Sequence, residues 1–189
     1  MAAGGLNIDQ IVLREIRLPM IDYFETSFGR TQDRHVLLVE IACQGKTGWG
    51  ECVAGESPFY SPETVDTAWS ILTRFILPTP VNRSFDHPSE FPSWFERVRG
   101  HRMAKACVEA ALWDLQAQRM DLPLWRLLGG TREKIPCGVS IGIQEDPQTL
   151  LQKIERELEA GYLAALIPES YGGSGLPLSA AGAILEGIH

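Results

Sequence analysis

The sequence has little of what membrane, secreted or nucleic-acid-binding proteins require. No hydrophobic run approaches the roughly 20 residues of a membrane-spanning helix, and the first residues lack the basic start and long apolar stretch of a secretion signal. The net charge is −7 and the pI is about 5.1, whereas nucleic acids and anionic membranes bind clustered cationic surfaces. We therefore expect neither a nucleic acid nor a membrane among the partners.

Cysteine and histidine are also scarce. The four cysteines are Cys43, Cys52, Cys107 and Cys137, and none forms a C-x-x-C pair. We therefore expect buried, reduced thiols in a cytoplasmic protein rather than disulfides. The four histidines lack the spacing of metal ligands, and the sequence offers no Ser-His-Asp or Cys-His arrangement. The sequence thus predicts no metal ligands and no catalytic residues of its own.

The hydrophobic pattern of the first part predicts a three-stranded antiparallel meander. Residues 8–18 form a first strand that ends at Pro19, and residues 35–43 are β-branched and apolar. Residues 44–48 have the composition of a turn and lead into a third short strand at residues 49–53.

Helical periodicity follows the meander. Ser61 is the expected N-cap and Pro62 the first residue of a helix, which is followed by a proline-rich break at residues 78–92. A longer helix is predicted at residues 103–120, and a short one at residues 123–128 ends at Gly129. The expected apolar face of the first helix consists of Val65, Ala68, Trp69, Leu72 and Ile76. The small side chains of the long helix, among them Cys107, Ala110 and Ala111, indicate close packing against a sheet.

After residue 130 the pattern changes to one strand and one helix. Residues 135–143 are typical of a buried strand, and Asp146 and Pro147 begin a helix that ends at Gly161. A strand followed by a helix opens a β/α barrel, which takes about 250 residues, whereas 55 residues follow residue 134. The predicted fold class is therefore α+β, with an incomplete TIM barrel after the meander and helices.

Four segments resemble a known enzyme family. Over residues 8–161 the sequence resembles the muconate-lactonizing subgroup of the enolase superfamily, and within it the o-succinylbenzoate synthase and N-acylamino acid racemase family. The segments are residues 24–29 (FETSFG), 48–53 with 58–61 (GWGECV and PFYS), 100–114 (GHRMAKACVEAALWD) and 136–143 (PCGVSIGI). Their order along the chain makes the resemblance specific.

The resemblance implies a two-domain enzyme in which a capping domain closes the mouth of a barrel. The barrel would hold Mg²⁺ on acidic residues and move a substrate proton with lysines. Residues 20–30 and 54–61 would be the two capping loops. By resemblance, the substrate-binding residues are Phe24, Phe28, Tyr60 and Ser140. The three aromatic residues would form apolar walls of the substrate site, and Ser140 would lie at the mouth of the first barrel strand. The alternative for each aromatic residue is that it anchors its loop by burial.

The sequence departs from the family after Tyr162. Leu166 and Pro168 occupy the positions of the family's Lys-x-Lys pair, and neither side chain can move a proton. Residues 168–176 read PESYGGSGL. On this run, residues 163–189 instead resemble the N-terminal segment of acyl-CoA dehydrogenases, without that family's FAD-binding region. We interpret the chain as a fusion joined near Gly161, with a capping domain at 1–130, a first βα unit at 131–161 and an unrelated tail at 162–189.

Three functions therefore stay open. In the first, the chain is a truncated or chimeric member of the family with no catalysis and no cofactor of its own. In the second, it is an interaction module that forms homo-oligomers or docks on an intact paralogue's barrel. In the third, it is active only with a barrel supplied in trans. Among the polar residues, Asp114 is expected to act as a cap or to pair internally, for example with an arginine. A solvated helix face with no other role is expected for Glu155, Arg156, Glu157 and Glu159.

Overall fold

The computed structural model describes residues 5–81, 84–132 and 139–159. The chain divides into two units, one formed by Met1–Pro19 with Arg34–Thr131 and the other by Met20–Asp33 with Arg132–His189.

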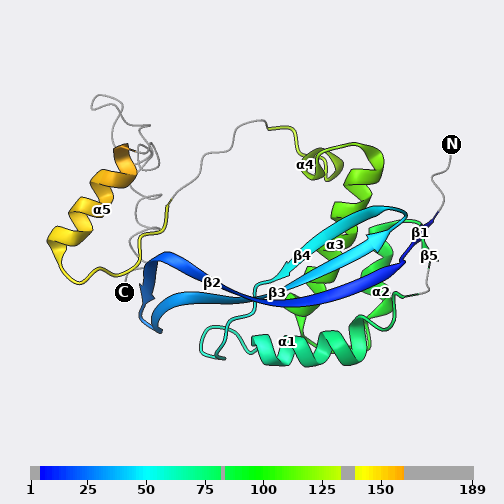
Figure 1. The fold of residues 1–189 in the computed structure, drawn as a ribbon, viewed down its shortest axis with the longest axis horizontal. Helices are drawn as coiled ribbons and strands as arrows, with labels where there is room; N and C mark the ends of the chain where they lie inside the picture. Colours follow the sequence, from blue (N-terminus) through cyan, green and yellow to red (C-terminus); the bar gives the residue numbers. More distant parts are fainter. Residues whose placement is uncertain (1–4, 82–83, 133–138, 160–189) are drawn as a thin grey trace. The chain divides into compact units, whose positions relative to one another are not determined.

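The predicted meander is confirmed. Strands β2 (Gln10–Thr26), β3 (Gly29–Cys43) and β4 (Lys46–Cys52) form a sheet in the order β2-β3-β4, and a second small sheet pairs β1 (Leu6–Asn7) with β5 (Ser84–Phe85) (Figure 1). Between β3 and β4 the antiparallel register runs from Leu37 opposite Cys52 to Cys43 opposite Lys46.

Strand β2 does not end at Pro19, as the sequence predicted, but continues to Thr26. Proline lacks the N–H that a strand donates to its neighbour, and is tolerated at the edge of a sheet. Because β2 is an edge strand, Pro19 does not interrupt it. The predicted turn between β3 and β4 is confirmed, with positive φ angles at Gln44 (51°) and Gly45 (78°), as a tight hairpin requires.

The first helix begins three residues later than predicted. Its N-cap is Thr64 rather than Ser61, and Thr64 and Thr67 form a reciprocal capping box before α1 (Val65–Ile71). The helix continues as a π-helical turn, η1 (Leu72–Ile76). The predicted apolar face is buried at Val65, Ala68, Leu72 and Ile76, whereas Trp69 is 38% exposed and does not belong to it.

The proline-rich segment separates two helical regions, as predicted, but contains short elements of its own. These are β5, the 3-10 turn η2 (Pro88–Glu90) and α2 (Phe91–Trp94). The rings of Phe91 and Phe95 lie 4.8 Å apart between centroids, and both residues are buried in the core. The break in periodicity therefore marks a region that still contributes to the core.

Helix α3 (Arg102–Met120) lies against one face of the sheet (Figure 1), and its backbone approaches β4 very closely. A Cβ atom on Gly50 would overlap the carbonyl oxygen of Cys107 and lie 3.0 Å from the backbone nitrogen of Ala111. A Cβ on Gly48 would lie 2.6 Å from Cγ of Leu115. The predicted close packing of small helix residues on the sheet is therefore confirmed, and glycine on β4 makes it feasible.

Side chains of α3 also satisfy the free edge of β4. The carboxylate of Asp114 accepts the backbone N–H of Trp49 at 2.9 Å, and the Gln118 amide donates to the carbonyl of Thr47 at 2.7 Å. Gln118 also donates to Asp114 at 3.1 Å. Asp114 thus pairs internally as predicted, but with a strand N–H and an amide rather than an arginine.

The N-terminus of α3 is capped from a distant segment. His101 precedes the helix in a left-handed conformation and makes no side-chain cap. Instead, the buried carboxylate of Glu63 accepts the N–H groups of Met103 (3.0 and 3.1 Å) and Ala104 (3.2 Å). Glu63 directly precedes Thr64, the N-cap of α1, and therefore joins the beginnings of α1 and α3. At the other end of the unit, α4 (Leu124–Leu127) stops before Gly129, whose φ is 83°.

The second unit contains α5 (Pro147–Glu159), which begins where the sequence predicted. Asp146 accepts hydrogen bonds from the backbone N–H and hydroxyl of Thr149, both at 2.8 Å. Of the predicted strand at 135–143, residues 135–138 lie outside the described residues, and 139–143 do not form a strand. Their backbone hydrogen bond to a strand, Ile143 N–H to Glu25 C=O at 2.9 Å, is too little for a ladder. Leu166, Pro168 and the rest of the predicted tail at 162–189 also lie outside the described residues.

Candidate functional site

The segment predicted to be the first capping loop is instead the end of a β-hairpin. β2 runs to Thr26 and β3 starts at Gly29, so the connection is a short turn in which the Phe28 N–H donates to Thr26 Oγ1 at 3.2 Å. The Gln32 side chain donates to the carbonyl of Met20 at 2.8 Å. We call residues 20–33 the hairpin tip. The prediction of a loop, made by resemblance, was wrong in its structure, because residues 20–26 and 29–30 belong to strands. The capping role of this segment stays a prediction.

The four predicted substrate-binding residues are all open to solvent. Phe24 is 36% exposed, Phe28 is 63% exposed, Tyr60 is 86% exposed, and Ser140 is also exposed. Phe24 and Phe28 on the hairpin tip and Ser140 belong to the second unit, and Tyr60 belongs to the first. Their contact with a substrate remains a prediction.

Within the second unit, the segment that follows Ser140 packs on the hairpin tip. A Cβ on Gly142 would lie 2.9 Å from the backbone nitrogen of Glu25 and 3.1 Å from the ring of Phe24. The next residue, Ile143, makes the backbone hydrogen bond to Glu25. The structure therefore brings the segment of Ser140 against the part of the hairpin that bears Phe24, two regions that the sequence analysis assigned to one substrate site.

The second predicted capping loop, residues 54–61, belongs to the first unit and is held by contacts that the sequence analysis missed. The carbonyl of Gly55 accepts the N–H of Val65 at 2.9 Å. The side chain of His35, only 8% exposed, lies between two carboxylates, with Nε2 2.6 Å from Glu15 and Nδ1 3.3 Å from Glu56. Nothing in the local sequence indicates this arrangement, because the three residues come from separate segments.

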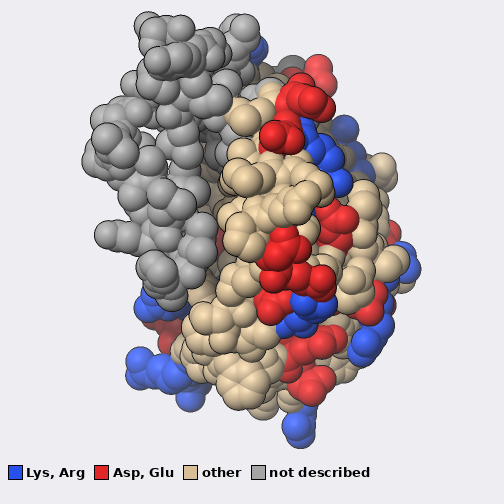
Figure 2. Space-filling model, turned by 90° about the vertical axis from the view of Figure 1, so that its left-hand side faces the viewer, with Lys and Arg blue, Asp and Glu red and all other residues tan. Residues whose placement is uncertain are grey.

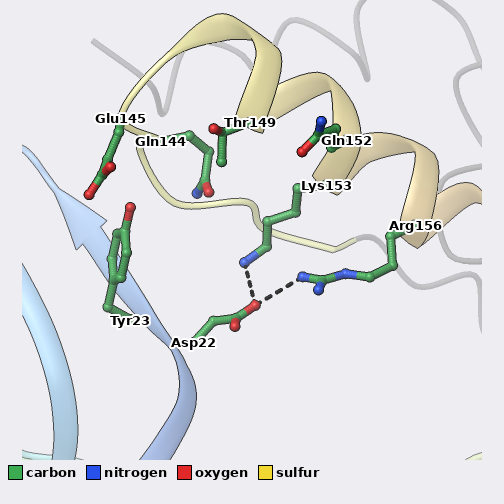
Figure 3. Close-up of a pocket in the computed structure, with 8 residues that line it drawn as sticks. All are labelled: Asp22, Tyr23, Gln144, Glu145, Thr149, Gln152, Lys153 and Arg156. Carbon is green, nitrogen blue, oxygen red and sulfur yellow. Dashed lines mark hydrogen bonds and ion pairs between the residues drawn. The ribbon is translucent and has the colours of Figure 1, made fainter.

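A polar pocket of about 500 Å³ lies in the second unit, between the hairpin tip and α5 (Figure 3). The Asp22 carboxylate accepts hydrogen bonds from Lys153 at 3.1 Å and from Arg156 at 2.9 Å. The hydrogen bond and charge of Lys153 lower the pKa of Asp22 below its ordinary value. The pocket is lined by Asp22, Tyr23, Gln144, Glu145, Thr149, Gln152, Lys153 and Arg156. The prediction that Arg156 belongs to a solvated face with no other role was wrong.

A second charged contact borders the same pocket. The Arg30 guanidinium donates to Glu25 at 2.8 Å, lies 3.6 Å from a carboxylate oxygen of Glu145, and stacks 3.9 Å from the centroid of the Tyr23 ring. The hydrogen bond to Glu25 raises the pKa of Arg30. The cations of the pocket are thus paired with carboxylates, an arrangement suited to holding backbone segments rather than to moving protons.

The described residues offer no donor set for the Mg²⁺ that the resemblance implies. Among them, no three His, Cys, Asp or Glu side chains lie where they could hold a metal ion.

The thiols of Cys43, Cys52 and Cys107 are free and buried. No helix in the described part of the chain is long and apolar enough to cross a membrane. Acidic and basic side chains are interspersed on the face drawn in Figure 2.

Comparison with known proteins identifies the relatives of this chain. Residues 9–129 match the family model described as mandelate racemase / muconate lactonizing enzyme, N-terminal domain. The chain is 45% identical over 159 residues to an o-succinylbenzoate synthase of Geobacillus kaustophilus, covering 84% of this chain and 42% of that protein. It is 39% identical over 157 residues to an N-succinylamino acid racemase of Thermus thermophilus, covering 83% and 42%.

A solved structure with a similar fold comes from the same superfamily as the relatives found by sequence. An enolase-superfamily member from Listeria innocua superposes with a TM-score of 0.75 at 34% sequence identity, covering 83% of this chain and 43% of that one. The chain therefore spans about two fifths of the length of the relatives it matches.

Proposed function

The chain belongs to the mandelate racemase / muconate lactonizing enzyme family through its N-terminal domain, and we propose that it is the capping part of an o-succinylbenzoate synthase or N-acylamino acid racemase-like enzyme. The observation that carries this proposal is the identity of 45% to a synthase and 39% to a racemase, each over more than 150 residues. Both activities begin with removal of a proton next to a carboxylate, so they share the need for a shaped, water-excluding cap.

In this proposal the chain binds and shields the substrate rather than reacting with it. In the complete enzyme Mg²⁺ would stabilise the negative charge that develops on the substrate carboxylate. Phe24 and Phe28 on the hairpin tip, and Tyr60 on the second capping loop, would contact the acyl part of the substrate and exclude water. Ser140 would offer a hydroxyl at the mouth of the first barrel strand.

We further propose that these 189 residues have no enolase-type activity by themselves. Leu166 and Pro168 stand where the family has its Lys-x-Lys pair, and a hydrocarbon or pyrrolidine side chain cannot exchange a proton. The resemblance of residues 163–189 to acyl-CoA dehydrogenases supports a fusion near Gly161. Sequencing the gene region would contradict the fusion if an uninterrupted Lys-x-Lys reading frame follows Tyr162.

A second candidate function is that of an interaction module. Several large apolar side chains are exposed, among them Ile21 at 102%, Phe28 at 63% and Phe59 at 71%, and exposed apolar surface favours association. A second copy of the chain, or the barrel of an intact paralogue, would cover such a surface. Activity in trans with a separate barrel is the catalytic version of the same association.

The experiment that tests these functions uses the purified chain and a chimera. The chain alone should show no Mg²⁺-dependent formation of o-succinylbenzoate and no racemisation of N-succinylamino acids. A chimera that joins residues 8–161 to the remaining barrel of the Geobacillus synthase should regain one of these activities, and Phe24→Ala should alter its KM. Turnover by the chain alone would contradict the proposed inactivity, and an inactive but folded chimera would contradict the proposed capping function.

If the chain alone is inactive, its association state separates the remaining functions. Analytical ultracentrifugation of the chain, alone and mixed with the separately expressed barrel of the Geobacillus synthase, measures dimerisation and docking directly. Activity restored by the mixture would support action in trans. A chain that stays monomeric at high concentration and does not bind the barrel would contradict the interaction module.

A further inference from the structure

The contacts between the hairpin tip and α5 form a charged clasp. The tip is residues 20–33, and Figure 3 shows its Asp22 facing the side chains of α5. The same oxygen of Asp22 accepts from both Lys153 (3.1 Å) and Arg156 (2.9 Å). These two cations are three residues apart, so they lie on one face of the helix. The side chain of Lys153 is only 18% exposed, so its ammonium is held near the carboxylate rather than dispersed in solvent.

Two further contacts reinforce the clasp. Arg30 bridges from the tip to Glu145, which lies just before α5, at 3.6 Å. The backbone of residues 142–143 lies against Glu25, with the Ile143 N–H donating to its carbonyl at 2.9 Å. A Cβ on Gly142 would crowd this contact. The tip is thus joined to the segment 142–156 at three places along its length.

The large apolar side chains of the tip are only partly covered in the described chain. Ile21 is fully exposed and Phe28 is 63% exposed, whereas Met20 and Tyr23 are half-buried. Because an isolated hairpin is marginally stable, the polar contacts with the segment 142–156 help to hold the tip in place. The ion pairs of Asp22 with Lys153 and Arg156 join the tip to the helix itself.

We propose that Asp22, Lys153 and Arg156 act as a reversible clasp that positions the capping hairpin. Exposed ion pairs are individually weak and are screened by salt, so the clasp holds the tip without locking it. Its consequence for substrate binding rests on the proposed function, because the clasp would set where Phe24 and Phe28 stand over a barrel. Asp22 is a positioning residue in this proposal and does not touch the reacting atoms.

Hydrogen–deuterium exchange of the full 189-residue chain tests the clasp without any need for activity. In Asp22→Asn the amides of residues 20–33 should exchange about 2- to 10-fold faster, as the loss of two exposed ion pairs predicts. Glu155→Gln is the matched control, because it removes the same charge from an exposed position on α5. The difference between the two variants should shrink in 0.5 M NaCl. Equal exchange in Asp22→Asn and the parent chain would overturn the proposal.

A charge swap separates the clasp from a general effect on folding. Asp22→Lys combined with Lys153→Glu and Arg156→Glu should restore slow exchange, whereas Asp22→Lys alone should increase exchange further. Failure of the swap, with the first unit still folded by circular dichroism, would also overturn the proposal. In the chimera, Asp22→Asn should raise KM with little change in kcat. An unchanged KM together with the expected exchange effect would contradict the role in substrate binding but not the clasp.

Discussion

Of the glycines in the part of the chain that the structure describes, Gly50 on β4 has the nearest neighbouring atom, which lies on α3. Gly50→Ala is the substitution that probes this close approach. The added methyl group would overlap the carbonyl oxygen of Cys107 and lie 2.8 Å from its carbonyl carbon and 3.0 Å from the nitrogen of Ala111. All three are backbone atoms of a buried part of the helix, so no side-chain rotation can relieve the overlap. The helix or the strand must move as a whole.

The cost follows from what must move. Overpacking a well-packed core typically costs about 1–3 kcal/mol, and a clash with backbone belongs at the upper end of that range. Replacing glycine by alanine also makes the unfolded chain less flexible, which offsets about 0.4–1 kcal/mol of this loss of stability. We therefore expect Gly50→Ala to lower the free energy of unfolding by about 2–3 kcal/mol.

Urea unfolding followed by circular dichroism measures this change. With a denaturant slope of about 1–3 kcal/mol/M, the midpoint should fall by about 0.7–3 M. Gly55→Ala is the control, because the closest atom to its new Cβ, the carbonyl oxygen of Ser57, is 3.8 Å away. Its stability should be unchanged or slightly raised. Equal stability of Gly50→Ala and the parent chain would refute the close approach of α3 to β4.

The buried carboxylate of Glu63, the buried thiol of Cys107 and the carboxylate of Asp22 each allow a further prediction. Glu63→Ala should lower the free energy of unfolding by about 1.5–3 kcal/mol, because it removes a charged acceptor from the N–H groups that begin α3. Urea unfolding measures this loss of stability, and an unchanged stability would show that water replaces the cap. The hydrogen bond with Cys52, and burial with it, raise the pKa of the Cys107 thiol. Mass spectrometry after treatment with a thiol reagent should therefore find Cys107 modified only in the denatured chain. Because Lys153 lowers the pKa of Asp22 from 3.8, the clasp is complete above the unfolded value and lost as the pH falls through the folded one. Exchange of the hairpin tip, corrected for its intrinsic rate, should therefore accelerate below about pH 4, and a constant corrected rate would contradict the ion pair.

The elements that the sequence predicted well are those whose evidence is local. The long helix at residues 102–120 and the start of α5 at Pro147 were predicted to within a residue. Their periodicity and caps lie within a few residues of one another, and that is enough to specify a helix. The three strands of the meander were found for the same reason, although their ends were not.

The errors arose where a distant residue decides the structure. Pro19 was expected to end its strand, and only the position of β2 at the sheet edge explains why it does not. The N-cap of the first helix was expected at Ser61, but α1 begins after Thr64. The intervening Glu63 instead accepts the N–H of Met103 at the start of α3, 40 residues away. A local pattern does not show which strand will be an edge or which helix end will lack a cap.

The sequence by itself therefore determined the family and the order of the strands and helices of the first unit. The contact of its aromatic residues with a substrate stays a prediction. Only the tertiary structure decided which charges meet. Arg156 looks like any solvated residue of an amphipathic helix, yet it pairs with Asp22 across a separation of 134 residues. Hydrophobic periodicity predicts which face of an element is buried, because burial depends on residue type. The partner of an exposed charge depends on how distant segments meet in the fold, and for that reason the clasp could not be predicted from sequence.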